Sequence, residues 1–262
     1  MRLNENIAVS TSRILLVPYD AHHVEQYHKW MEDPSIREAT ASERLSLEEE
    51  YENQASWRES PDKLTFIVCA PLPQGHDGPP GAQEGKKGAV LAGVGDAVHR
   101  MVGDVNLFLS PWDGDDEDEQ EQKEKEAKTY YTAEIDIMIA DPEFRGKGLG
   151  RAAVATFLSF VRRRLDGVLA EYTGSLGVAD ANIDGKPVLR DVVAKINADN
   201  KASIVLFKAL GFKQRGETNY FGEIQMVFEG FGERDDGWER MNSGVMGDGY
   251  EELVYDRSQL KK

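Results

Sequence analysis

The stretch IMIADPEFRGKGLG at residues 137–150 decides the fold, because it predicts a strand, a turn and a helix in succession. Its apolar start is typical of a buried strand, and three glycines at alternate positions favour a turn. Glycine lets backbone N–H groups approach an anion closely, and a helix N-terminus adds about half a positive charge. The cations Arg145, Lys147 and Arg151 lie in the same segment, so it is suited to hold a diphosphate.

The glycine spacing separates four interpretations of this turn. A dinucleotide-binding fingerprint needs G-x-G-x-x-G after the first strand of its unit, whereas this G-x-G-x-G lies in mid-chain. A Walker loop needs G-x-x-x-x-G-K-[ST], which the sequence lacks. The pattern R/Q-x-x-G-x-G/A, which holds the pyrophosphate of coenzyme A, is matched by Arg145, Gly148 and Gly150. The fourth interpretation is a tight turn that binds nothing.

On both sides of this stretch, hydrophobic periodicity and capping signals predict further helices and strands. The expected strands are 13–17, 64–70, 101–109, 133–140, 191–196 and 220–228, and the expected helices are 22–31, 46–58, 149–165 and 200–210. The order β, α, α, β, β, β, α, β, α, β indicates a mixed α/β domain with antiparallel pairs first and crossover connections later.

Three segments interrupt this pattern and are predicted to be insertions, at about 71–96, 113–128 and 166–185. The first holds four prolines and seven glycines between residues 71 and 95, and the second holds nine acids between 113 and 126. We therefore expect one domain over residues 1–229, followed by a tail over 230–262 that is rich in glycine and charge.

Composition narrows the functional class. The chain has 262 residues and a net charge of −16, which argues against nucleic-acid binding and is compatible with a basic peptide or amine as substrate. Cys69 is the one cysteine, so neither an intrachain disulfide nor a cysteine zinc site is expected. No apolar run approaches the ~20 residues of a membrane span. We expect a monomer in the cytoplasm, with the nucleus as the alternative compartment.

The turn and a second motif together resemble the GNAT superfamily of N-acetyltransferases. The second motif is NKASIVLFKALGF at residues 200–212, and the two motifs have the order and separation typical of the superfamily. The resemblance covers roughly residues 13–229. More narrowly, LVPY at 16–19, TASE at 40–43 and MVGDVNLFL at 101–109 are similar to the eukaryotic N-acetyltransferase 9-like proteins.

The resemblance implies an acyl-CoA N-acyltransferase fold, in which helices flank a splayed central mixed sheet. It implies transfer of an acetyl group from acetyl-CoA to a primary amine, at the N-terminus or a lysine of a protein, without a metal. The alternative from another class is a non-catalytic protein of the same fold that binds acetyl-CoA and a protein partner.

The resemblance also implies which residues contact acetyl-CoA. The pantetheine arm is expected along Ile137, Met138 and Ile139, through their backbone groups. The remaining candidates are the turn and helix residues Arg145, Gly146, Lys147, Gly148, Leu149, Gly150 and Arg151, and Asn200, Ser203 and Phe207 of the second motif.

Catalytic candidates lie on the strand before the turn. Glu134 stands eleven residues before Arg145, the spacing of the general base in histone-type members, and Asp136 shares its strand face. Many members carry a tyrosine general acid near the position of Phe207, which cannot donate a proton. Ser203 is therefore the candidate acid.

Three histidines are the remaining metal-ligand candidates in the predicted helix 22–31. His22, His23 and His28 lack the i, i+4 spacing of a helical metal pair, and surface or packing roles are expected for them.

Overall fold

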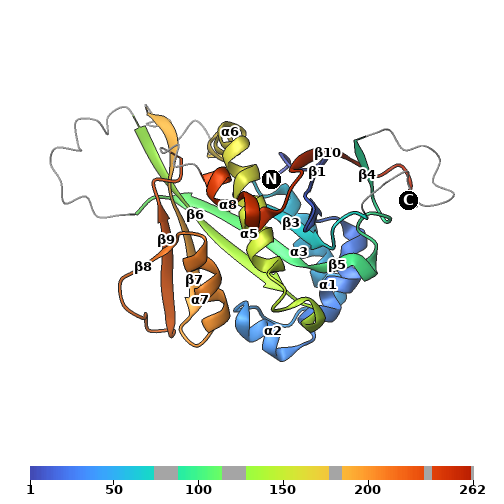
Figure 1. Ribbon diagram of the computed structural model, residues 1–262, viewed down its shortest axis with the longest axis horizontal. Helices are drawn as coiled ribbons and strands as arrows, with labels where there is room; N and C mark the ends of the chain where they lie inside the picture. The colour runs from blue at the N-terminus through green and yellow to red at the C-terminus, as the bar shows by residue number, and fades with distance from the viewer. Residues whose placement is uncertain (74–87, 114–127, 177–184, 233–237, 261–262) are drawn as a thin grey trace.

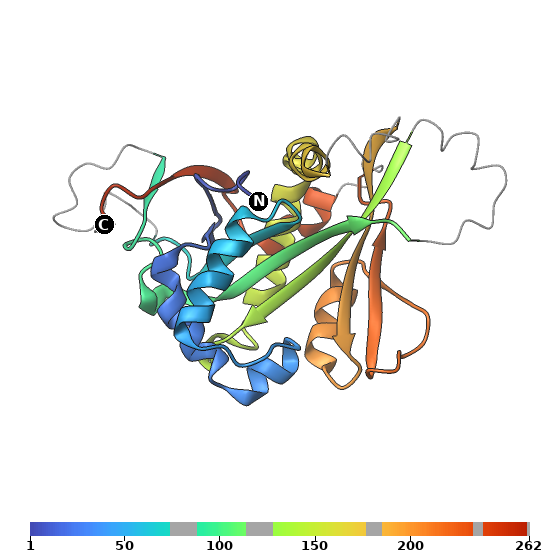
Figure 2. The same ribbon diagram turned by 180° about the vertical axis from the view of Figure 1, so that it is seen from behind.

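The computed structural model describes residues 1–73, 88–113, 128–176, 185–232 and 238–260. Its strands form one mixed sheet of ten strands in the order β4-β10-β1-β2-β3-β5-β6-β7-β9-β8, with helices on both faces (Figures 1 and 2). The strands are β1 Ile7–Ser10, β2 Leu15–Pro18, β3 Lys63–Cys69, β4 Ala89–Leu91, β5 Met101–Pro111, β6 Lys128–Ile139, β7 Lys186–Asn197, β8 Lys213–Arg215, β9 Glu223–Glu229 and β10 Glu251–Asp256. The α-helices are α1 Val24–Met31, α2 Pro34–Ala39, α3 Leu47–Glu59, α5 Leu149–Arg163, α6 Leu165–Ser175, α7 Lys201–Ala209 and α8 Trp238–Met246.

The mixed α/β fold confirms the prediction, and all ten predicted elements form. Local signals explain their placement. Ser46, for example, caps α3 as predicted, because its Oγ accepts the Glu49 N–H at 3.3 Å while the Glu49 carboxylate accepts the Ser46 N–H at 2.7 Å. None of the helices in the described ranges has the length and apolar character needed to cross a membrane.

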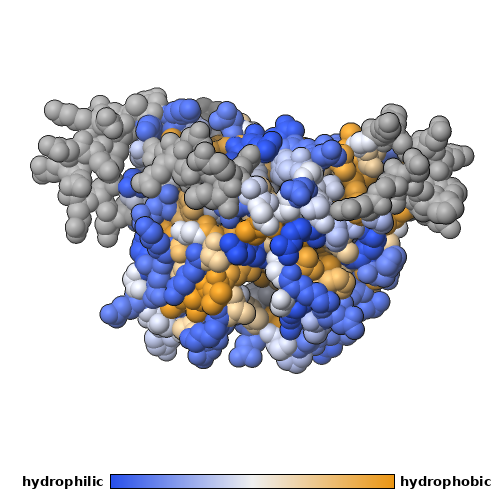
Figure 3. All heavy atoms as spheres, viewed as in Figure 1, coloured by the Kyte–Doolittle hydropathy of each residue, from blue (hydrophilic) through white to orange (hydrophobic). Residues whose placement is uncertain are grey.

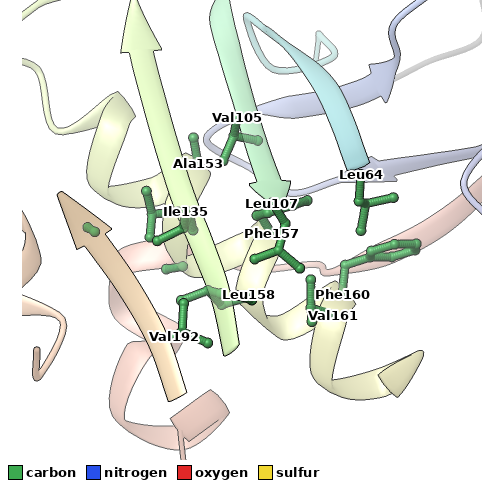
Figure 4. Close-up of a cluster of buried hydrophobic side chains, with 14 of the residues drawn as sticks. Leu64, Val105, Leu107, Ile135, Ala153, Phe157, Leu158, Phe160, Val161 and Val192 are labelled. Carbon is green, nitrogen blue, oxygen red and sulfur yellow. The ribbon is translucent and has the colours of Figure 1, made fainter. Parts of the chain in front are cut away.

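The main core lies between the sheet and α5. Val105 and Leu107 of β5 and Ile135 of β6 are buried on one sheet face against Phe157 and Leu158 of α5 (Figure 4). The opposite face carries α1 and α3, which lie in front of the sheet in Figure 2. From Asp104 onward, the even-numbered residues of β5 share one face with the even-numbered residues of β6 and face these helices, because side chains alternate along a strand.

The predicted domain end at residue 229 is wrong. Helix α8 packs on α5, and β10 enters the sheet between β4 and β1. Trp238 is 1% exposed and stacks edge-to-face on Phe228, with ring centroids 5.1 Å apart. The segment 230–262 carries few apolar anchors in a glycine- and charge-rich stretch, so its periodicity gave no strong signal.

The predicted insertions have mixed outcomes. Residues 114–127 of the acidic stretch and 74–87 of the first insertion lie outside the described residues. Ala89–Leu91 at the end of the first insertion pairs in parallel with β10. The first half of the predicted insertion 166–185 is helix α6, which buries Val168, Leu169 and Tyr172.

Truncation of Trp238 tests whether the C-terminal segment belongs to the domain. We expect Trp238→Ala to lower the free energy of unfolding by ~3–5 kcal/mol, the usual cost of deleting a buried aromatic ring. Urea denaturation followed by tryptophan fluorescence and circular dichroism measures it. Val98→Ala, at a side chain 54% exposed, is the control and should cost less than ~0.5 kcal/mol. An unchanged midpoint for Trp238→Ala would restore the interpretation as a dispensable tail.

Candidate active site

Strands β6 and β7 separate at the centre of the molecule. Their parallel pairing ends at Glu134 opposite Val193, although β6 continues to Ile139 and β7 to Asn197. On its other side, β6 stays paired with β5 as far as Ile139 opposite Gly103. The predicted splay is therefore present, and residues 135–139 form an edge of β6 without a β7 partner in the described ladder.

The peptide groups of this open edge are directed toward β7. The Ala140 N–H donates to Val102 O at 2.9 Å, so the backbone of Ala140 faces the β5 side. Backbone groups alternate between the two sides of a strand, so those of Ile137 and Ile139 face the splay. Such an edge can pair with an extended amide chain, as in strand addition.

The turn after β6 forms a cradle of backbone donors. Gly146 and Gly148 adopt left-handed φ values of 70° and 76°, which favour glycine. The first bond of α5 runs from the Ala152 N–H to Gly148 O at 3.0 Å, so the N–H groups of residues 149–151 lie before the helical ladder. This is the arrangement that the sequence predicted for a diphosphate.

The arginines around the turn contact different parts of the backbone. Arg145 folds back and donates to Ile139 O at 2.8 Å and to Ala140 O at 2.9 Å, so it braces the strand end. Arg13, which the sequence analysis did not select, donates to Lys147 O at 3.0 Å. A Cβ atom on Gly148 would lie 3.0 Å from the Arg13 guanidinium. Arg13 is 134 residues from Lys147, so no local pattern reveals this contact.

The second motif forms the N-terminus of α7. Asn200 caps the helix as predicted, because its side-chain oxygen accepts the Ser203 N–H at 3.1 Å. Ser203 is half-buried one turn into the helix. The expected contact of Phe207 with the cofactor does not fit, since the ring is 2% exposed and packs on Phe212 with centroids 5.0 Å apart. Phe207 belongs to the hydrophobic core.

The two predicted acids of β6 have different surroundings. Glu134 accepts a hydrogen bond from Lys195 Nζ of β7 at 2.6 Å, an ion pair that holds its carboxylate. Asp136 reaches solvent, yet it is crowded by protein atoms and by other acids. This crowding, together with the charges of Glu134 and Asp104, raises the pKa of the Asp136 carboxyl to about 7.

The sequence analysis missed a third acid on the same face, Asp104 of β5. It is 2% exposed, accepts a hydrogen bond from Asn106 Nδ2 at 2.7 Å, and lies 3.4 Å from the hydroxyl of Tyr27. Burial raises the pKa of its carboxyl to about 6. The sequence feature that could have indicated Asp104 is an acid at an even-numbered position of the otherwise apolar stretch 101–109.

A surface hollow adjoins the ion pair of Lys195. It is lined by Lys195, Arg215, Gly216, Glu217, Asn219, Glu223, Ile224 and Gln225. Two exposed aromatic side chains, Tyr220 and Phe221, follow in the same β8–β9 connection. In Figure 3 the surface is indented between α7 and α2, and apolar residues gather beside the indentation over α7. The acids of β6 thus lie on a strand bordered by surface that a substrate can reach.

Two of the histidines meet Asp96 in a cluster with the composition of a metal site. His22 Nε2 and His23 Nε2 lie 3.0 and 2.8 Å from the same Asp96 oxygen. However, His23 Nδ1 accepts the Asp20 N–H at 3.0 Å, so in the neutral ring the proton resides on Nε2. That tautomer donates to Asp96 and offers no lone pair to a metal. The cluster is a hydrogen-bond network that ties the turn just before α1 to the segment before β5.

The comparisons with known proteins agree with this geometry. A family model described as an acetyltransferase (GNAT) domain matches residues 13–213. An N-acetyltransferase 9-like protein of Caenorhabditis briggsae is 38% identical, covering 88% of this chain and 89% of the relative. An alpha/beta-tubulin-N-acetyltransferase 9 of Homo sapiens is 37% identical, covering 86% of this chain and 84% of the relative.

Solved structures show the same fold. A spermidine N-acetyltransferase from Vibrio cholerae, in complex with CoA and spermine, aligns with a TM-score of 0.52 at 15% identity, over 85% of this chain and 98% of that chain. A ribosomal L7/L12 alpha-N-protein acetyltransferase in complex with coenzyme A aligns with a TM-score of 0.50 at 13% identity, over 84% and 95%. The sequence matches and the fold together establish that the chain belongs to the GNAT family of N-acetyltransferases.

Proposed function

We propose that this N-acetyltransferase moves the acetyl group of acetyl-CoA to a primary amine of a protein, with Asp136 as the proton acceptor. One observation carries the proposal: a single strand, β6, joins the open edge beside β7, the donor cradle at residues 146–151 and the acid Asp136. The proposed sites for the diphosphate, the thioester and the amine therefore lie along β6 and the turn that follows it.

The cradle accounts for the nucleotide half of acetyl-CoA. The N–H groups of residues 149–151 and the helix dipole of α5 attract the diphosphate, and Arg13 and Lys147 add positive charge beside it. The amides of the pantetheine arm match the peptide group of Ile137 and the N–H of Ile139 along the open edge, while Arg145 occupies Ile139 O. These contacts hold the thioester still, which is a large part of what catalysis requires.

The chemistry then needs a neutral amine. A primary amine gives up its proton to the Asp136 carboxylate, directly or through one water, and its nitrogen attacks the thioester carbonyl. A backbone N–H of the open edge donates to the oxyanion that forms. As the thiolate of coenzyme A leaves, the remaining extra proton on nitrogen passes to water, and Ser203 at the start of α7 is the candidate relay that passes a proton from water to the thiolate.

The acceptor is proposed to be a protein amine, with tubulin as the first substrate to test. Relatives at 37% identity in Drosophila melanogaster and Homo sapiens are named alpha/beta-tubulin-N-acetyltransferase 9. The hollow beside Lys195 and the exposed Tyr220 and Phe221 provide polar and aromatic surface for a polypeptide next to the acids.

Transfer of radiolabelled acetyl groups tests the proposal. The full-length chain is incubated with labelled acetyl-CoA and purified α/β-tubulin, and the acetylated positions are mapped by mass spectrometry. We expect labelled tubulin, release of coenzyme A in equal amount, and transfer by Asp136→Asn that is slower by ~10²–10⁴. Tight binding of acetyl-CoA without transfer to tubulin or to a library of peptide N-termini and lysines would instead favour the non-catalytic protein of the same fold.

A further inference from the structure

We propose that Asp104 acts on the reaction through Asp136, as a second and buried carboxyl at the diagonal position on the same sheet face. In this role Asp104 is a positioning residue, because it lies beneath the site and need not touch the substrate. The inference rests on the proposed function only in that Asp136 is the proton acceptor. It assigns a task to the acid that the acetyl-transfer mechanism leaves unused.

The sheet register brings the two acids together. Asn106 of β5 lies directly opposite Asp136 of β6, and Asp104 lies two residues along the same face. Diagonal neighbours of this kind are ~7–8 Å apart between Cα atoms, within reach of side-chain electrostatics. The Asn106 amide donates to Asp104 Oδ2 at 2.7 Å, so one side chain both faces Asp136 and holds Asp104.

The buried position of Asp104 is not explained by a contribution to the stability of the fold. Its Oδ1 atom and the Oδ1 atom of Asn106 are both buried and have no hydrogen-bond partner in the described part of the chain. No cation pairs with the Asp104 carboxylate among the described residues, and its side-chain donors are the Asn106 amide at 2.7 Å and the Tyr27 hydroxyl at 3.4 Å. A buried carboxylate that no cation pairs with costs stability, so its presence beneath the site calls for a role in the chemistry.

The charges around the two acids favour their coupling. Asp136 is faced by Glu134 of its own strand, Asp104 of β5, Lys195 of β7 and Glu223 of β9. Asp104 is faced by Asn106 and by Tyr27 of α1, while Tyr19 and Glu50 of α3 lie near that tyrosine. Lys195 is the one cation of this set, and it is held by Glu134 at 2.6 Å. The negative charge of Asp104 therefore acts on the Asp136 carboxyl with little compensation by positive charge.

This coupling suits a proton acceptor that works near neutral pH. An ordinary aspartate has a pKa of ~3.9 and is too weak a base for an amine, whereas a carboxyl with a pKa close to the working pH is effective. The charge of Asp104 adds to burial and to the charge of Glu134 in raising the pKa of Asp136 to about 7. The amine proton that Asp136 takes up is thus stabilised by the buried charge behind it.

The test is the pH dependence of Asp104→Asn, which keeps the size of the side chain and removes its charge. Removing a negative charge lowers the pKa of Asp136, so the carboxylate persists at lower pH. The acidic limb of kcat/KM should therefore move down by on the order of 1 pH unit, and the plateau rate should fall, at unchanged affinity for acetyl-CoA. An acidic limb identical to that of the wild type would overturn the proposal.

Asp191→Asn is the matched control. Asp191 is also 2% exposed, but it pairs with Arg215 at 2.9 Å and lies opposite Thr132, four residues along β6 from Asp136. We expect this variant to lose stability without moving the pH profile. If both variants shift the acidic limb of kcat/KM equally, the shift comes from losing any buried acid and not from losing Asp104 in particular. That result would count against the proposal.

A carboxyl titration by ¹³C NMR separates this inference from the proposed function, since it needs no turnover. In the wild type, the Asp136 signal should titrate near neutral pH, and in Asp104→Asn it should titrate lower. If Asp104→Asn does not fold, the wild-type titration alone decides. Titration of Asp136 near pH 4 in the wild type would contradict the coupling. Normal coupling without acetyl transfer would contradict only the proposed function.

Discussion

The variant Gly148→Glu is expected to lose measurable affinity for acetyl-CoA while keeping the fold. The new carboxylate would stand where the diphosphate is proposed to bind, beside the N–H groups of residues 149–151. It would also engage the Arg13 guanidinium, which lies 3.0 Å from the position of a Cβ atom on Gly148. Repulsion of a ligand with several negative charges and loss of a cation act in the same direction. Isothermal titration calorimetry with acetyl-CoA measures the effect, and we expect a loss of at least ~100-fold.

Backbone strain must be separated from charge in this experiment. Gly148 has a left-handed φ of 76°, so any other residue there costs ~1–2 kcal/mol. Gly88, directly before β4, has a left-handed φ of 95° with open space around its Cβ position, and in the sheet order five strands separate β4 from β6. Gly88→Glu therefore adds the same charge at another left-handed glycine, away from the turn, and should bind acetyl-CoA normally. Unchanged affinity in a folded Gly148→Glu protein would remove the cofactor assignment.

Contiguous motifs made much of this fold predictable from sequence. The turn at 137–150 encodes a strand end, two left-handed glycines and a helix start within fourteen residues, so local rules suffice. The core face of α5 follows from its apolar periodicity in the same way. Strand β10 lies where the sequence suggested one short element, at 250–255, whereas helix α8 escaped because its buried anchor Trp238 stands in polar surroundings, and a single residue has no period.

The site was less predictable, because its decisive contacts join residues far apart in the chain. Arg13 reaches the turn from 134 residues away, and Lys195 reaches Glu134 from 61 residues away. The sequence indicated Glu134 as the first candidate for the base and Asp136 as the second. It could not reveal that Lys195 pairs with one of them while Asp104 lies on the same sheet face as the other.

These contacts reverse the order of the two acids as candidates. The Glu134 carboxylate is engaged by Lys195 Nζ at 2.6 Å, so it is not free to meet an incoming amine. Asp136 has no such partner among the described residues, and crowding and like charges raise the pKa of its carboxyl to about 7. We therefore propose Asp136, ahead of Glu134, as the proton acceptor, with Glu134 holding Lys195 beside the hollow.

The variant Asp136→Asn is accordingly expected to lower kcat by ~10²–10⁴, the usual size of a lost general base, with nearly unchanged affinity for acetyl-CoA. Glu134→Gln is the comparison and should act mainly on KM for the acceptor, through Lys195 and the hollow. Steady-state kinetics on the acetylated protein, with calorimetry for the cofactor, distinguish the two. The opposite order, with Glu134→Gln inactive and Asp136→Asn active, would return the role to Glu134.

The pH profile sharpens this prediction. In the wild type, kcat/KM should rise about tenfold per unit below pH 7 and level off above it, because only the carboxylate of Asp136, with a pKa of about 7, accepts the proton. In Asp136→Asn that limb disappears, and the rate should follow the fraction of neutral amine. For a lysine acceptor this fraction keeps growing toward pH ~10.4, whereas for an α-amine it saturates near ~8. The residual profile therefore reports the class of acceptor. If both variants keep wild-type activity and profile, the proton leaves to bulk water and neither acid of β6 is the base.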